Sequence, residues 1–131
     1  MSEITQRQKL EQGRAKHAYE AAEKAKKSKD YKQYAKKVPM LIKTNGLGAT
    51  LAFMAAKGGA YKTILDNIQE WLKEDVKFKS ILSEIKGAEG KDDLMAKIVN
   101  CDSFQYRTLT IEVLAYLGWL RRFADALNEN K

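Results

Sequence analysis

Residues 38–57 decide the fold, and they read VPMLIKTNGLGATLAFMAAK. This stretch contains the chain's one proline, Pro39, and its longest largely apolar run, residues 47–56. The chain before it is basic and polar, whereas the chain after it is balanced in charge and amphipathic. A helix that is apolar on all sides is a buried helix, and its glycines and alanines let neighbouring backbones approach closely. The stretch therefore predicts the central, buried helix of an all-helical protein.

The composition favours helices along the whole chain. Its 131 residues are the size of one domain with a core of its own. Hydrophobic residues make up 44% and charged residues 31%, which is ordinary for a globular protein. Alanine, lysine, glutamate and leucine are frequent, and no segment shows the two-residue alternation of a strand. We expect a single all-α domain over residues 1–131, folded as a compact bundle of about six helices.

Apolar spacing and glycines mark the expected helices. A first helix over residues 3–28 has only a thin alanine stripe, so we expect it to lie across the surface or to be covered by another subunit. Asp30 is the expected cap of a second helix, which either kinks or restarts at Pro39. Asn45-Gly46 is compatible both with a turn and with a glycine inside a continuous helix, and the sequence does not decide between them. Gly58-Gly59 ends a helix. Amphipathic helices then follow near residues 61–72, 78–85, 92–99 and 103–127, the last two capped by Asp92 and Ser103.

Positive charge is concentrated in the first third of the chain. Residues 1–43 contain twelve Lys and Arg against five Asp and Glu, which accounts for the whole net charge of +7, and residues 44–131 are neutral. Such asymmetry indicates a surface for a polyanion, or else a solvated helix without a partner. The polar positions are mostly lysines, which contact phosphates without reading bases, unlike the Arg, Asn and Gln of a helix-turn-helix reader. Helical spacing of the tyrosines among them favours packing over base stacking. We expect phosphate contacts from Lys16, Lys24, Lys36 and Lys37.

No arrangement of residues predicts catalysis, a metal site or a cofactor. The one histidine, His17, and the one cysteine, Cys101, are far apart in sequence. We expect His17 to be exposed and Cys101 to be buried or half-buried at a helix end. Neighbouring carboxylates such as Asp92 and Asp93 point about 100° apart on a helix, which suits caps and surface charge. The glycines lack the Gly-Lys-Ser/Thr ending of a phosphate loop. We therefore expect a protein that is not an enzyme.

The sequence favours a cytoplasmic location. One cysteine forms no intrachain disulfide, which fits a reducing compartment. The first residues, MSEITQRQKLEQ, lack the apolar segment of a signal peptide. The apolar run over residues 47–56 has about half the length needed to cross a bilayer. We expect no membrane-spanning segment.

A series of short motifs covers nearly the whole chain. The most specific are IKTNGLGATLAF at residues 42–53 and LGWLRRFA at residues 117–124. The others are Arg14 with Ala18-Tyr19, Lys37-Val38-Pro39, Trp71-Leu72, Tyr106-Arg107, and Thr110 with Glu112. In order and spacing these motifs resemble one known family, the small subunit of type III-B (Cmr) CRISPR RNA-guided effector complexes.

The resemblance implies an all-helical, non-catalytic subunit of a complex for antiviral RNA silencing. Copies of such a subunit stack beside the backbone subunits and help to hold guide and target RNA in a basic groove. Target cleavage belongs to the backbone subunits, and cyclic-oligonucleotide chemistry belongs to the large subunit. The implied partners are these subunits, further copies of the chain, and both RNAs. The polar residues at matching motif positions, which become RNA-binding candidates, are Arg14, Lys43, Asn45, Arg107 and Arg121.

Three alternatives stay open. The type III-A small subunit is the nearest of them, and the Asn45-Gly46-Leu47 block disfavours it. A DNA-binding helical regulator would bind one operator, and its binding would survive high salt. A basic adaptor would use the same lysines to meet an acidic protein.

Overall fold

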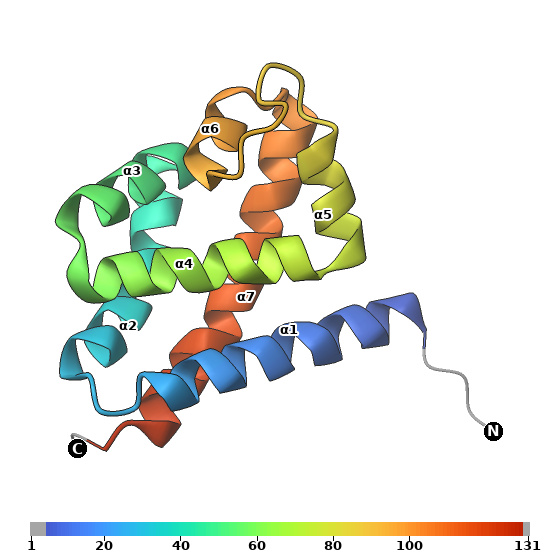
Figure 1. Cartoon of the computed structure of the whole chain (residues 1–131). Helices are drawn as coiled ribbons and strands as arrows, with labels where there is room; N and C mark the ends of the chain where they lie inside the picture. The colour runs from blue at the N-terminus through green and yellow to red at the C-terminus, as the bar shows by residue number, and fades with distance from the viewer. Residues whose placement is uncertain (1–4, 130–131) are drawn as a thin grey trace.

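Seven helices occupy residues 5–129, the part of the chain that the computed structural model describes (Figure 1). They are α1 (Gln6–Lys24), α2 (Lys29–Asn45), α3 (Leu47–Lys57), α4 (Gly59–Glu74), α5 (Val76–Ser83), α6 (Leu94–Val99) and α7 (Ser103–Leu127). No strand occurs among these residues, which confirms the all-α prediction. The structure has one helix more than the expected six because the chain breaks at Gly46, between α2 and α3.

The longest helix, α7, organises the others. Both α1 and α2 pack along α7, and α4 packs on α2 and α3. In Figure 1, α4 crosses in front of α7, while α3 and α6 lie together at the top of the view. The lower left end of the molecule brings together the end of α1, the start of α2 and the end of α7 (Figure 1). There the Glu129 amide donates to the Lys26 carbonyl oxygen at 2.9 Å.

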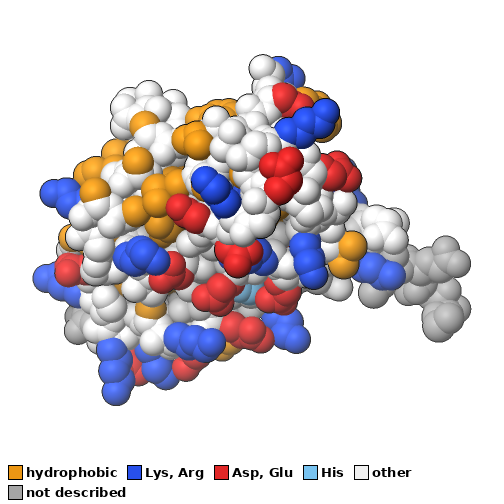
Figure 2. Space-filling view, turned by 45° about the horizontal axis from the view of Figure 1, so that its top comes forward, with side chains coloured by type: hydrophobic (Ala, Val, Ile, Leu, Met, Phe, Trp, Pro, Cys, Tyr) orange, Lys and Arg blue, Asp and Glu red, His pale blue; other side chains and the backbone are white. Residues whose placement is uncertain are grey.

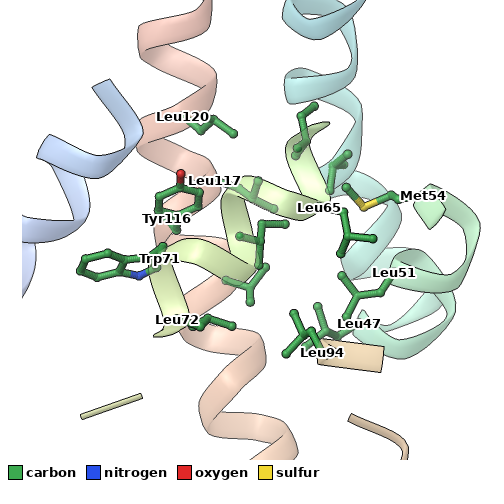
Figure 3. Close-up of a cluster of buried hydrophobic side chains, with 14 of the residues drawn as sticks. Leu47, Leu51, Met54, Leu65, Trp71, Leu72, Leu94, Tyr116, Leu117 and Leu120 are labelled. Atoms are coloured by element: carbon green, nitrogen blue, oxygen red, sulfur yellow. The ribbon is translucent and has the colours of Figure 1, made fainter. Parts of the chain in front are cut away.

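Figure 3 shows part of the hydrophobic core, where side chains of α3, α4, α6 and α7 lie together. Leu51, Leu72 and Leu117 are each fully buried. Burying one leucine side chain contributes about 1.5–3 kcal/mol to stability. Figure 3 labels side chains from four helices in this cluster, namely Leu47, Leu51, Met54, Leu65, Trp71, Leu72, Leu94, Tyr116, Leu117 and Leu120.

The prediction of a central buried helix over residues 38–57 is wrong. The chain stays helical through Pro39, which lies inside α2, and then breaks at Gly46. The following helix, α3, buries one face through Leu47, Leu51 and Met54. Its alanines at positions 49, 52 and 56 are exposed, and Figure 2 shows hydrophobic side chains gathered at the upper left, where α3 lies. An alanine buries little apolar area, so its exposure costs little, and a run of alanines does not require a buried helix.

Gly46 makes the turn between α2 and α3, which settles the alternative left open at Asn45-Gly46. Its φ of 89° and ψ of 162° fall in a region that is essentially restricted to glycine. The Gly48 amide, two residues later, donates a hydrogen bond to the Tyr106 hydroxyl of α7 at 3.1 Å. A Cβ added at Gly46 would lie 3.2 Å from that same hydroxyl. The turn therefore holds the start of α3 against the start of α7.

We expect Gly46→Ala to lower the free energy of unfolding by about 1–3 kcal/mol, because alanine is strained at this backbone conformation. Gly58→Ala is the matched control, since Gly58 also has a positive φ, 69°, but nothing lies within 4 Å of an added Cβ. Urea unfolding at neutral pH measures both variants. If Gly46→Ala lowers the free energy of unfolding by no more than Gly58→Ala does, the close approach of the added Cβ to the Tyr106 hydroxyl adds nothing to the backbone strain.

The first helix lies across the surface, which is one of the two arrangements expected for it (Figure 1). It begins with a capping box between Thr5 and Gln8 and ends at Lys24. Its buried face consists of Ala18, Ala21 and Ala22, whose small side chains let α1 lie close to α7. The chain's own α7 and α4 thus cover this face. Ile4, which the predicted stripe included, lies outside the described residues.

Several helix caps differ from the predicted ones by one or two positions. The structure has Ser28 in place of Asp30, Asp93 in place of Asp92, and Asp102 in place of Ser103. In each case the side chain that caps the helix accepts a hydrogen bond from a backbone amide two or three residues later. Asp75 caps α5 in the same way, so acidic pairs do supply caps, as expected.

Candidate nucleic-acid interface

Arg14, one of the RNA-binding candidates, lies inside the fold. Its Nε and Nη2 atoms donate to the two carboxylate oxygens of Glu112 at 2.7 and 2.6 Å, and Trp71 Nε1 donates to the same carboxylate at 2.8 Å. The Glu112 side chain is 4% exposed and the Arg14 side chain 15%. Hydrogen bonding to Glu112 raises the pKa of Arg14, so the guanidinium stays charged. Arg14 is therefore occupied in joining α1, α4 and α7.

His17 is nearly buried, so the prediction that it is exposed is wrong. Its side chain is 10% exposed, and its Nδ1 lies 2.8 Å from the Tyr116 hydroxyl oxygen. Its Nε2 lies 3.8 Å from carboxylate oxygens of Glu70 and Glu74, and Figure 2 shows the histidine between acidic side chains. The prediction failed because it was based on charged neighbours such as Lys16 and Glu20, which are exposed on α1. His17 itself is on the side that faces α7.

Basic side chains line the border between α2 and α7. Lys32 and Lys36 of α2 both reach Asp125 of α7, with Nζ–Oδ1 distances of 3.6 and 3.3 Å. Lys43 follows Lys36 by seven residues, which is two turns along the same side of α2. Arg121 precedes Asp125 by one turn and so lies on the side of α7 next to α2.

The other end of this border is fixed by the hydrogen bond between Gly48 and Tyr106. That bond places the end of α2 beside the start of α7, so Lys43 and Arg107 lie toward the same end of the molecule. Arg107 also shares the α2 side of α7, because it is fourteen residues, four helical turns, before Arg121. We name this surface the α2–α7 edge, and its residues are Lys32, Lys36, Lys43, Arg107 and Arg121.

The remaining candidates are exposed but lie elsewhere. Lys16 and Lys24 are exposed on α1. Lys37 and Asn45 are exposed on α2, outside the row formed by Lys36 and Lys43. The structure therefore brings four of the nine candidates together along the edge, keeps Arg14 inside the fold, and separates the other four.

The pKa of Asp125 responds to the positive charges of the α2–α7 edge. The Lys36 ammonium, followed by that of Lys32, holds the pKa of this carboxyl below its ordinary value of 3.8. A depressed pKa means that these contacts stabilise the fold above about pH 3.8 and are lost as the pH falls through the folded-state pKa. Lys36→Gln is expected to move the NMR titration midpoint of Asp125 upward, toward 3.8. An unchanged midpoint would show that Lys36 and Asp125 do not pair in solution.

Residues 5–129 contain no cluster of side chains suited to hold a metal ion. Nowhere among them do three or more His, Cys, Asp or Glu side chains gather closely enough to hold a metal ion. No helix in that range has the length and apolar character needed to cross a membrane. Cys101 is half-buried, as expected. Burial, and next the charge of Asp102, raises the pKa of its thiol, which disfavours the reactive thiolate.

These features define a small all-helical protein in which five basic side chains lie along the border between α2 and α7. Residues 10–127 match the sequence model of the Cas_Cmr5 family of CRISPR-associated proteins, and the chain belongs to this family. The CRISPR system Cmr subunit Cmr5 of Thermus thermophilus is 31% identical over 99 residues, which cover 76% of this chain and 75% of that protein.

A crystal structure of a CRISPR-associated Cmr5 family protein from Thermus thermophilus has a similar fold. It aligns with a TM-score of 0.73 at 31% identity, over 92% of this chain and 98% of that chain. The resemblance to the small subunit of type III-B (Cmr) complexes is thus confirmed.

Sequence reasoning missed three exposed or partly exposed residues along the α2–α7 edge, one basic and two apolar. Lys32 is one turn before Lys36, and this four-residue spacing was the signal that marks it. Met40 and Ile111 are 66% and 62% exposed, and each lies one turn after a basic residue of the edge. No local signal distinguishes them, because an apolar residue in an amphipathic helix is ordinarily read as part of the core.

Proposed function

We propose that this chain is the non-catalytic small subunit of a type III-B (Cmr) effector complex and that its α2–α7 edge contacts the backbone of guide or target RNA. Membership of the Cas_Cmr5 family supports the role in the complex. The observation that carries the RNA contact is the edge itself, because α2 and α7, which are distant in sequence, pack together and each carries basic side chains along their common border. Lys and Arg neutralise phosphates irrespective of sequence, as a subunit that accepts any guide requires.

The same edge also favours contact with protein. Met40 and Ile111 expose most of their side chains between the basic residues, and exposed apolar groups beside charge are typical of interaction surfaces. The proposed protein partners are the backbone and large subunits of the complex and further copies of this chain. A basic adaptor that binds an acidic protein through the edge is the second candidate function, and the same two exposed residues favour it.

Salt dependence of RNA binding by the isolated protein tests the proposal. Lys36, Lys43, Arg107 and Arg121 offer about four phosphate contacts, which predicts a slope of about −3 for log affinity against log salt. Affinity for a fluorescent single-stranded RNA is then expected to fall about fiftyfold between about 50 and about 200 mM salt. Fluorescence anisotropy with RNAs of unrelated sequence measures it, and all are expected to bind equally.

Two results would contradict the RNA contact. Binding that persists at high salt and selects one DNA sequence would identify a DNA-binding regulator. Absence of RNA binding at low salt, together with binding to an acidic protein of the complex, would identify the adaptor.

A further inference from the structure

A pocket of about 460 Å³ opens between α2 and the turn that joins α3 to α4. Its volume is in the range of sites for small ligands. None of the residues that line this pocket belongs to the α2–α7 edge, so the two are distinct. The lining residues are Asp30, Tyr34, Lys37, Phe53, Lys57, Gly58, Gly59, Ala60 and Tyr61.

Three aromatic rings form one wall of the pocket. The rings of Tyr34 and Tyr61 are stacked, with centroids 3.8 Å apart and 1° between their planes. Phe53 meets Tyr61 edge-on at 5.1 Å. Tyr61 is 6% exposed, whereas Phe53 is 38% exposed. Tyr61 is therefore the buried ring of this wall, and Phe53 is the ring most accessible to a planar group from solvent, as in aromatic platforms for single-stranded nucleic acids.

Positive charge surrounds the aromatic wall. The Lys57 ammonium lies 5.8 Å from the centroid of the Phe53 ring, and Lys37 contributes a second positive charge. Asp30 is the one acidic residue of the lining, so the side chains leave a net positive charge. An added Cβ at Gly58 or Gly59 would meet nothing within 4 Å, so the backbone at the start of α4 is open to a ligand.

We propose that this pocket binds one nucleotide of single-stranded RNA, with the base stacked on Phe53 and the phosphate held by Lys37 and Lys57. Backbone amides at the start of α4 add donors beside the phosphate, because the first turn of a helix has amides without helical partners and α4 has no side-chain cap. A nucleotide combines a planar ring with an anionic phosphate, so it would contact both the aromatic wall and the two lysines. The inference rests on the proposed function, since it requires RNA beside the chain.

NMR titration of the full, isotope-labelled chain tests the inference with two probes, a hexamer of uridylate and inorganic phosphate. The hexamer is expected to shift the Phe53 ring signals together with the Gly59 and Ala60 amides. Inorganic phosphate is expected to shift only the amides. Phe53→Leu and Lys57→Gln are each expected to weaken hexamer binding about threefold to tenfold. Phe53→Tyr is expected to bind like the parent chain.

Lys86→Gln is the matched control, because Lys86 is exposed and lies outside the pocket lining, and it is expected to leave hexamer binding unchanged. If the hexamer shifts signals of the α2–α7 edge but not those of Phe53, the pocket inference is overturned and the proposed function stands. If both probes shift only the amides, the site binds simple anions and base stacking is overturned. If the hexamer shifts no signal at all, the proposed function itself fails.

Discussion

Glu112→Gln is expected to lower the free energy of unfolding by about 3–5 kcal/mol, the ordinary cost of removing one partner of a buried ion pair. The carboxylate accepts hydrogen bonds from Arg14 and Trp71, which come from two other helices. A glutamine keeps the shape of the side chain but leaves the Arg14 charge unbalanced at a site where its partner is 4% exposed. Urea unfolding followed by circular dichroism measures the change.

Two further variants sharpen this test. Glu84→Gln changes an exposed carboxylate and is expected to alter stability by less than about 0.5 kcal/mol. Arg14→Met in the Glu112→Gln background removes the unbalanced charge and is expected to restore part of the lost stability. If Glu112→Gln costs no more than Glu84→Gln, the network does not hold α1, α4 and α7 together.

Reversing three charges of the α2–α7 edge is expected to have the largest effect on RNA binding. The variant Lys36→Glu, Lys43→Glu and Arg121→Glu replaces about three phosphate contacts by repulsion. At low salt its affinity for single-stranded RNA is expected to fall by at least about thirtyfold, and its salt slope to approach zero. Fluorescence anisotropy over a range of salt concentrations provides both quantities.

The control variant changes net charge equally outside the edge. Lys73, Lys86 and Lys91 are exposed, and none of them belongs to the α2–α7 edge. Replacing these three with glutamate is expected to weaken RNA binding by only a few-fold, through long-range repulsion. Equal losses in both triple variants would mean that total charge, and not the edge, governs binding.

Helix positions could be predicted from the sequence because they depend on local features. Apolar spacing placed the helices of the C-terminal half, and Gly58-Gly59 marked the end of α3. The exact caps could not be predicted, because several polar residues near each start are equally able to cap. Whether Asn45-Gly46 forms a turn was left open by the sequence, and the hydrogen bond that joins the next turn to Tyr106 links residues 58 positions apart.

Features of the site that depend on contacts between distant segments could not be predicted from local sequence patterns. Arg14 and Glu112 are 98 residues apart, so nothing near Arg14 shows that its charge is balanced inside the fold. Similarly, the neutral total charge of residues 44–131 conceals Arg107 and Arg121 on one side of α7. The family motifs pointed to these two arginines, whereas composition pointed only to the lysines of the first third. The edge itself emerges when α2 and α7 are placed side by side.

Target-RNA binding by a complete type III-B complex, reconstituted with the edge variant Lys36→Glu, Lys43→Glu and Arg121→Glu, tests the central claim most directly. We expect the variant to enter the complex in the same proportion as the parent chain, as measured by native mass spectrometry. The complex is then expected to bind target RNA about tenfold or more weakly than the parent complex. No change in salt concentration is expected to restore its affinity. Unchanged RNA affinity in an intact complex, or loss of assembly with RNA binding retained by the remaining subunits, would contradict the claim.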